Sequence, residues 1–296
     1  MITPILPFYN LNNYKRQEIS FQGKDLLKLT SLGITKKARS AIRDETNIIG
    51  KGGEGIVYKI PKSKYCVKIT GDDLFYFGNW NINVQPHEKV NHVVAIADNG
   101  TRMMTIIEGQ ALNYKNNPEE VYCLPSESYI TILKQITKAK KYGKFFDNSP
   151  YNIIYNAKQK TLTAIDFTDD SSFNEDKFEP ISQLFDAMRD NEQSIHALKR
   201  NRQLIARLLN IVLEIIPKGN ISEFPIFYDD INSLFEYAVK ELHPATSKRQ
   251  YSTLKRITLD IVTSREEKKL DIGEKEILNK KIKSAQKLID KVLLSE

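Results

Sequence analysis

The segment that most constrains this chain is 145–155, where an acid and an amide stand in a polar turn bordered by apolar residues. Asp147 and Asn152 lie in that turn, and a second acid, Asp166, follows fourteen residues after Asn152 at the end of another apolar stretch. The pattern predicts a turn and a β-hairpin that bring the three side chains to one point. Two carboxylates and an amide oxygen suit Mg²⁺ better than zinc. Taken alone, the same composition is also typical of a plain surface turn.

A glycine-rich segment at 50–55 indicates nucleotide binding independently. A dinucleotide-binding loop with G-x-G-x-x-G spacing should lead into a helix, but the apolar, β-branched residues 56–60 predict a strand. A Walker loop requires Lys and then Ser or Thr after its last glycine, and Ile56 and Val57 stand there instead. The remaining type is G-x-G-x-x-G-x-V, whose missing side chains let backbone N–H groups approach nucleotide phosphates. Its candidate binding residues are Gly50, Gly52, Gly53, Gly55 and Val57.

A lysine within a short apolar stretch follows this loop. Lys68 stands thirteen residues after Gly55, in the predicted strand 65–69. Such a lysine can contact nucleotide phosphates, although a lysine on an edge strand also serves to discourage aggregation. The glycine loop and this lysine resemble those of the protein kinases, in which an acid pairs with the lysine, so the resemblance implies an acidic partner for Lys68. Glu88 is the candidate and Asp73 the alternative, and either could be a surface acid.

Taken in order, these motifs resemble those of the protein kinases. Kinases carry a G-x-G-x-x-G-x-V loop, a strand lysine, a catalytic loop H-R-D-x-x-x-x-N and a metal-binding D-F-G. The catalytic loop is matched by Asp147 and Asn152, and the metal-binding motif by Asp166 and Phe167. The resemblance implies ATP and Mg²⁺ as cofactors, with Asp147 as the catalytic base. It further implies that Asn152 and Asp166 are the metal ligands and that Lys68 contacts the phosphates.

The resemblance also implies an α+β, bilobal protein kinase-like fold. We expect an N-terminal extension at 1–45, a small lobe at 46–108, a large-lobe catalytic core at 109–190 and a helical C-terminal region at 191–296. The last region either completes the large lobe or is appended to it. Glu108 stands where the chain crosses between the lobes, at the expected adenine site. No A-P-E motif follows Asp166, so we expect a reduced activation segment.

Minimal kinases with a shortened activation segment occur among the type III secreted effectors of pathogenic bacteria, and the chain is similar to them over 46–190. The similarity includes an Arg-Met pair, Arg102 and Met103. It implies a Ser/Thr protein kinase that acts as a virulence factor in the host cytoplasm, with a eukaryotic host protein as substrate. An activating host protein is a further implied partner. The N-terminal extension would then brace the small lobe or serve in export and docking.

Three departures from the kinase pattern bear on activity. Phe145 replaces the His of the catalytic loop, where it can serve in packing, and Thr168 replaces the final Gly of D-F-G. Ser149 stands where Ser/Thr kinases carry a Lys, which removes a positive charge near the transferring phosphoryl group and lowers the rate. A pseudokinase scaffold and a small-molecule phosphotransferase of kinase-like fold are therefore alternatives to a protein kinase.

Composition limits the binding partners and the cellular compartment that we expect for this protein. The formal net charge is +7, but no Lys/Arg block with interleaved aromatic residues marks a nucleic-acid groove. Cys66 and Cys123 form no metal pattern and suit a reducing compartment. The sequence has no apolar run long enough for a transmembrane segment and no conventional signal peptide. We expect a cytosolic protein, or one exported into a host cell by an unconventional route.

Periodic apolar residues predict the remaining elements. Hairpin strands are expected at 153–155 and 162–165, and helices at 24–32, 35–45, 129–142, 181–189, 195–216, 229–242 and 251–268. A last helix is expected to begin at Asp271, because Asp271 and Glu274 have the spacing of a capping box. The lysines of this helix are interpreted as a solvated face, with an anionic membrane or a partner as the alternative; they are Lys280, Lys283, Lys287 and Lys291.

Overall fold

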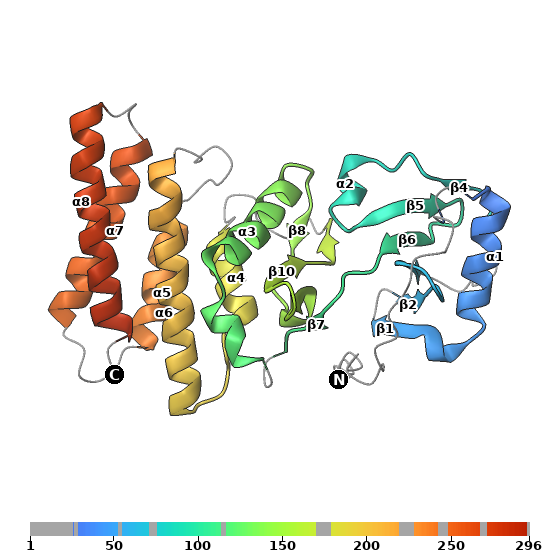
Figure 1. Ribbon diagram of the computed structural model, residues 1–296, viewed down its shortest axis with the longest axis horizontal. Helices are drawn as coiled ribbons and strands as arrows, with labels where there is room; N and C mark the ends of the chain where they lie inside the picture. Colours follow the sequence, from blue (N-terminus) through green and yellow to red (C-terminus); the bar gives the residue numbers. More distant parts are fainter. Residues whose placement is uncertain are drawn as a thin grey trace. The chain divides into compact units, whose positions relative to one another are not determined.

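The computed structural model describes residues 26, 29–52, 55–70, 76–113, 117–169, 179–218, 228–241, 248–266 and 271–294. The chain divides into two compact units, Met1–Ala111 with Ile165–Phe167 and Leu112–Ala164 with Thr168–Glu296. An antiparallel sheet forms the centre of the first unit, and the second is mostly helical (Figure 1). The predicted α+β class is confirmed.

The sheet of the first unit has six strands in the order β1-β2-β3-β6-β5-β4, and neighbouring strands are antiparallel. The strands are β1 (Ile48–Gly52), β2 (Gly55–Lys59), β3 (Tyr65–Ile69), β4 (Trp80–Asn81), β5 (Val93–Ala97) and β6 (Arg102–Thr105). β3 pairs with β2 on one side and with β6 on the other, so Lys68 lies on an interior strand. The interpretation of Lys68 as a protective edge-strand lysine is therefore wrong.

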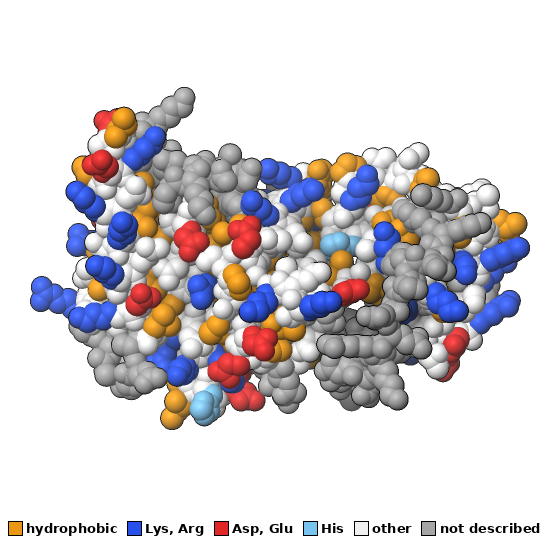
Figure 2. Space-filling model, in the orientation of Figure 1, with side chains coloured by type: hydrophobic (Ala, Val, Ile, Leu, Met, Phe, Trp, Pro, Cys, Tyr) orange, Lys and Arg blue, Asp and Glu red, His pale blue; other side chains and the backbone are white. Residues whose placement is uncertain are grey.

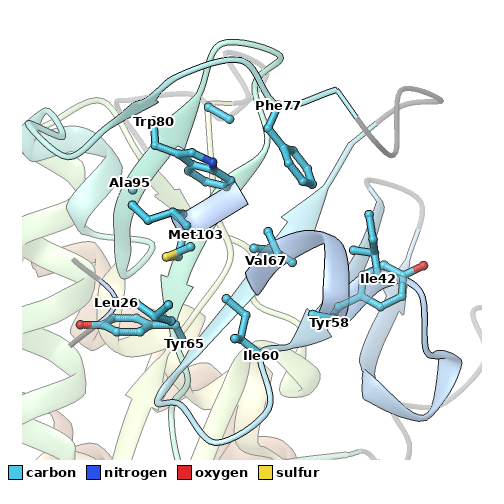
Figure 3. Close-up of a cluster of buried hydrophobic side chains, with 14 of the residues drawn as sticks. Leu26, Ile42, Tyr58, Ile60, Tyr65, Val67, Phe77, Trp80, Ala95 and Met103 are labelled. Atoms are coloured by element: carbon cyan, nitrogen blue, oxygen red, sulfur yellow. The ribbon is translucent and has the colours of Figure 1, made fainter. Parts of the chain in front are cut away.

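Helix α1 (Ser31–Ile42) shares an apolar core with this sheet (Figure 3). The side chain of Thr30 caps the helix by accepting a hydrogen bond from the Gly33 N–H. Buried residues at helical spacing face the core, and they pack in one cluster with side chains of the sheet and of the residue after β2: Ile34, Ala38, Ala41 and Ile42 from α1, Tyr58, Val67 and Met103 from the strands, and Ile60 directly after β2. The helix expected at 35–45 is thus observed, and it braces the sheet. Of the helix expected at 24–32, residues 24, 25, 27 and 28 lie outside the described residues. Its end is wrong, because Leu29 and Thr30 are not helical and Thr30 is the extended N-cap from which α1 begins.

The predicted hairpin and the helix before it open the second unit. α3 (Ser126–Lys140) packs on β10 (Thr161–Ala164), which is antiparallel to β9 (Ile153–Asn156). α3 ends as predicted before Gly143, whose φ of 69° favours glycine. The short strand β8 (Phe145–Phe146) and a 3₁₀ turn (Pro150–Asn152) then lead the chain into β9.

The remaining predicted helices are confirmed, with ends shifted by a few residues. They are α4 (Pro180–Met188), α5 (Ile195–Lys218), α6 (Tyr228–Lys240), α7 (Lys248–Glu266) and α8 (Ile272–Ile289). The capping box is present, because the Glu274 N–H donates to Asp271 Oδ1 at 2.8 Å and the Asp271 N–H donates to Glu274 Oε2 at 2.9 Å. α5 contacts α4, α6, α7 and α8, so the apolar stripe of α5 forms the centre of this bundle.

The other elements of the described residues are short. They are α2 (Pro86–Lys89), β7 (Gln110–Ala111), β11 (Phe167–Thr168), the 3₁₀ helices Glu45–Asn47 and Glu119–Cys123, and a π-helical turn at Asp290–Leu294. Within the described ranges, no helix is both long and apolar enough to cross a membrane.

Candidate nucleotide-binding and catalytic residues

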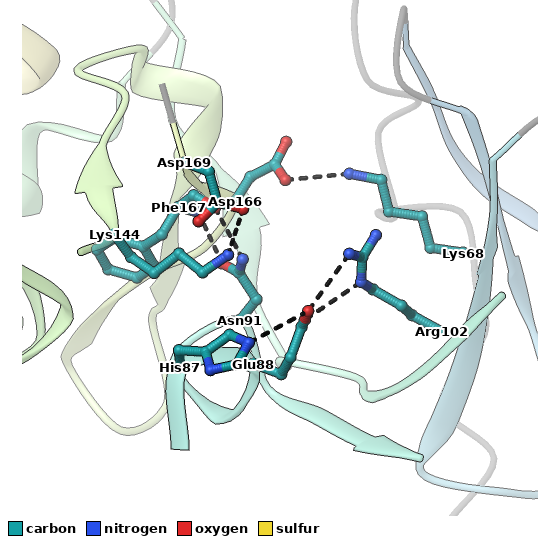
Figure 4. Close-up of polar contacts among 9 residues, drawn as sticks. All are labelled: Lys68, His87, Glu88, Asn91, Arg102, Lys144, Asp166, Phe167 and Asp169. Carbon is teal, nitrogen blue, oxygen red and sulfur yellow. Dashed lines mark hydrogen bonds and ion pairs between the residues drawn. The ribbon is translucent and has the colours of Figure 1, made fainter. Parts of the chain in front are cut away.

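Lys68 and Asp166 meet in the first unit although they stand 98 positions apart (Figure 4). Lys68 Nζ lies 3.1 Å from Asp166 Oδ1, and the two side chains are 15% and 49% exposed. Across the pairing of β3 with β6, Lys68 stands directly opposite Arg102. Two cations at such a position repel each other unless each has its own carboxylate. Asp166 supplies that carboxylate to Lys68.

Asp166 has a left-handed backbone, with φ at 59°, which is uncommon for a residue other than glycine. The side chain of Asn91 holds the next residue in place. The Phe167 N–H donates to Asn91 Oδ1 at 2.6 Å, and Asn91 Nδ2 donates to the Phe167 carbonyl at 2.8 Å. Asn91 thus makes both hydrogen bonds that a neighbouring strand would make, and it holds the backbone directly after Asp166. Backbone strain kept by such contacts is typical of functional sites.

Asn91→Ala should lower any activity that depends on Asp166, by about tenfold or more, because the Asp166 backbone loses its support. The substitution also leaves the Phe167 N–H without its acceptor, which should lower the free energy of unfolding by about 1–2 kcal/mol. Phosphoryl transfer and urea unfolding of the same sample measure the two effects. The exposed Asn83 provides the control, and equal activity of Asn91→Ala and Asn83→Ala would show that Asn91 does not position Asp166.

Glu88 was expected to pair with Lys68, and the structure places it with Arg102 instead. Arg102 Nε donates to Glu88 Oε2 at 3.2 Å, and Arg102 Nη2 donates to Oε1 at 3.4 Å. His87 Nε2 lies 3.9 Å from the same carboxylate. Arg102 and Lys68 face each other across the sheet, and the bidentate guanidinium is the better geometric match for a carboxylate. The alternative partner, Asp73, lies outside the described residues.

The candidate phosphate loop is the hairpin of β1 and β2. Gly52 stands opposite Gly55 in this hairpin, and Val57 stands opposite Lys68 in the pairing of β2 with β3. Directly opposed residues have side chains on the same face of a sheet, so Val57 and Lys68 are neighbours. Gly50 is buried in β1, and Gly53 lies outside the described residues. The structure thus places the loop beside the strand lysine.

Gly55 and Gly52 differ in whether the folded protein has room for a side chain at their positions. Gly55 has φ at 135°, and a Cβ there would lie 2.1 Å from the Ile69 carbonyl oxygen, whereas a Cβ on Gly52 meets nothing within 4 Å. Gly55→Ala should therefore lower the free energy of unfolding by about 2–4 kcal/mol. Gly52→Ala should leave unfolding nearly unchanged and weaken ATP binding, because only a bound phosphate would need that space. Urea unfolding and nucleotide titration separate the effects; unchanged ATP affinity in Gly52→Ala would exclude close phosphate contact there.

Asp147 and Asn152 are brought together in the second unit. Asn152 is buried in the 3₁₀ turn, and its Nδ2 donates to Asp147 Oδ2 at 3.1 Å and to the Asp147 carbonyl at 3.3 Å. Asp147 is exposed, whereas Phe145 before it is buried, which agrees with the packing role expected for Phe145. The exposed carboxylate of Asp147 is therefore held by a buried amide and can meet a molecule from solvent.

Three of these contacts carried no local sequence signal. Nothing local marks Asn91 as a partner of Phe167, and the Arg-Met pair at Arg102 does not indicate a contact with Glu88. The third is Lys144, which is 4% exposed and whose Nζ lies 2.6 Å from Asp169 Oδ2 within the second unit. An Asn before a strand or a Lys after a helix is too common a pattern to indicate a site. Glu108, the expected adenine contact, is exposed in the segment between β6 and β7.

Each of the two predicted metal ligands, taken within its own unit, has donor chemistry that suits magnesium. Asp166 offers a half-exposed carboxylate, and the amide of Asn152 directs its N–H side to Asp147, so that its oxygen is the group able to bind a metal. Both are hard oxygen donors of the kind that Mg²⁺ prefers. In the part of the chain that the structure describes, no three His, Cys, Asp or Glu side chains gather as a metal cluster.

No protein-family model matches the chain, and no curated protein matches its sequence. The functional assignment therefore depends on the motifs and on the contacts described above.

Proposed function

We propose that this chain is a protein kinase that uses ATP and Mg²⁺ and transfers the γ-phosphoryl group to Ser or Thr hydroxyls of a protein. The observation that carries the proposal is the 3.1 Å contact between Lys68 Nζ and Asp166 Oδ1. In kinases, the corresponding lysine binds the nucleotide phosphates and the corresponding aspartate binds the metal on them, so the two must face one nucleotide. If Lys68 were only a protective surface lysine and Asp166 only a turn residue, a contact between them would not be expected.

Each residue has a defined role in this proposal. Lys68 orients the α- and β-phosphates, and the hairpin from Gly50 to Gly55 covers them. Asn152 and Asp166 would hold Mg²⁺, which when bound offsets the negative charge of the phosphoryl group. Asp147 accepts the proton of the attacking hydroxyl, and its exposure suits a base that must reach a protein substrate.

The architecture of each unit supports a bilobal kinase-like fold with a reduced activation segment. The lysine lies on the third strand of an antiparallel sheet, directly after the glycine hairpin, as in kinases. α4 begins at Pro180, twelve positions after Thr168, which leaves room for only a short segment between them. The helices of 191–296 belong to the same compact unit as the Asp147 loop, which favours a completed large lobe over an appended bundle.

The proposal also includes where the kinase acts and on which kind of substrate. The similarity to secreted effector kinases favours a bacterial enzyme that acts on a protein of a eukaryotic host, within the host cytoplasm. The loss of a lysine at Ser149 lowers the intrinsic rate, which is consistent with a need for an activating host protein.

Transfer of radiolabelled phosphate from ATP with Mg²⁺ tests the proposal, with purified protein alone and with eukaryotic cell lysate. We expect labelled protein bands with the wild type and none with Asp166→Ala. Bands that need the lysate would identify a host substrate or activator. No label in any band, despite demonstrable ATP binding, would contradict a protein kinase and favour a small-molecule acceptor or a pseudokinase scaffold.

A further inference from the structure

A groove between α7 and α8 lies outside the residues assigned to phosphoryl transfer. Its volume is about 460 Å³, and side chains of both helices line it. The lining residues that matter here are Arg256, Ile257 and Asp260 from α7 and Ile277, Lys280 and Lys281 from α8. The two helices pack against each other in the second unit, so the groove is formed within one compact body.

The groove is strongly basic. Its lining carries three cations, Arg256, Lys280 and Lys281, and one carboxylate, that of Asp260. The surroundings have the same sign, because eleven Lys and Arg residues stand against six Asp and Glu over 248–266 and 271–294. Figure 2 shows Lys and Arg side chains along the edge that α7 and α8 form. An anionic ligand would be attracted to this edge from a distance and would find counter-charges in the groove.

The groove also has apolar walls. Ile277 is 58% exposed, although α8 already has a complete buried stripe on another face; that stripe consists of Leu278, Ile282, Ala285 and Ile289. Ile277, Lys281 and Ser284 are spaced by four and three and share the face that borders the groove. Ile257 contributes a second aliphatic side chain from α7. An exposed isoleucine set among cations is a surface on which an aliphatic group of a ligand gains by burial.

We propose that this groove binds an acidic peptide segment of a partner protein, with an aliphatic side chain of that segment placed between Ile257 and Ile277. Charge complementarity supports this occupant, and the apolar walls specify its side chain. A membrane surface is flat, and a recessed groove cannot use its apolar walls there. Nucleic acid is disfavoured because no aromatic side chain lines the groove to stack on a base. The inference does not depend on whether the chain transfers phosphate.

Fluorescence anisotropy with a labelled peptide, Glu-Asp-Leu-Glu-Glu-Leu-Asp-Glu, tests the proposal on the full-length chain. We expect saturable binding with a Kd of roughly 10–100 μM at low salt. Replacing both leucines of the peptide with serine should weaken binding about fivefold, because the aliphatic contact is lost. Lys280→Glu with Lys281→Glu should weaken it about tenfold or more.

The matched control is Lys275→Glu with Lys283→Glu, which changes the charge of α8 by the same amount outside the groove lining. This variant should bind the peptide within about threefold of wild type. Equal losses in the two double variants would overturn the proposal, because net charge alone would then explain binding. Absence of saturation at about 1 mM peptide would also overturn it. Binding to phosphatidylserine vesicles tests a membrane as the alternative partner. If the protein binds vesicles but not the peptide, and only the Lys280 and Lys281 variant loses vesicle binding, the groove is a membrane-binding surface and the proposal is wrong. Circular dichroism confirms that each variant is folded.

Discussion

Replacing Asp166 with Asn should lower phosphoryl transfer at least about a thousandfold while leaving the protein folded. Asn has nearly the same shape and tolerates the left-handed backbone that Asp166 adopts, so the turn before Phe167 is kept. The substitution removes the negative charge that faces Lys68 and that the proposed Mg²⁺ requires. Single-turnover transfer from labelled ATP measures the loss.

The expected change in the free energy of unfolding of Asp166→Asn is small, so a loss of phosphoryl transfer in this variant would not be caused by unfolding. The Asp166 side chain is half exposed, so loss of its ion pair should change the free energy of unfolding by less than about 1 kcal/mol. Asp290→Asn, at an exposed position directly after α8, is the control and should retain the wild-type rate. A wild-type rate in folded Asp166→Asn would remove Asp166 from the metal site and contradict the kinase proposal.

The regular elements were predictable because their signals are local. Residues three and four positions apart define the apolar faces of α3, α5 and α8, and the Asp271–Glu274 spacing marks the start of α8. The glycine spacing and the β-branched run after it likewise predict the hairpin of β1 and β2. Gly55 shows why that signal is reliable, since both its φ and the nearby Ile69 carbonyl exclude a side chain.

The partners of the site residues were less predictable, because they depend on distant pairings. Lys68 and Arg102 stand opposite each other in the sheet, and nothing local in the sequence says which cation Glu88 will neutralise. The prediction of a Lys68–Glu88 pair followed the kinase pattern, which expects a helix there, whereas α2 is only one turn long. Asn91 was missed for the same reason, since its partner Phe167 lies 76 positions away.

At about pH 4, Asp230→Ala should lower the free energy of unfolding by about 3–5 kcal/mol, the largest stability effect that we expect in the second unit. Asp230 is fully buried, and its carboxylate accepts from the Ile181 N–H at 3.1 Å and from the Ser182 N–H and Oγ at 2.8 Å each. These donors lie in the first turn of α4, so the substitution removes the cap of α4 and leaves buried donors unpaired. Urea unfolding measures the change. The exposed neighbour Asp229 is the control, and a comparable loss in Asp229→Ala would contradict the capping role.

The same buried carboxylate makes stability depend on pH in a defined direction. Burial raises the pKa of Asp230 from 3.8 to about 7, although hydrogen bonds from Ser182 and Ile181 act to lower it. The folded state therefore binds more protons than the unfolded state between about pH 4 and pH 7. The stabilising contribution of Asp230 is full below that window and is lost as the pH rises through it, at about 1.4 kcal/mol per pH unit.

Asp230→Asn does not titrate, so the difference in unfolding free energy between wild type and this variant isolates the pH dependence of Asp230 from that of all other groups. A difference that stays constant from pH 4 to 8 would contradict the raised pKa. It would mean that the hydrogen bonds to the carboxylate fully offset its burial, and that α4 is capped by a permanently charged group.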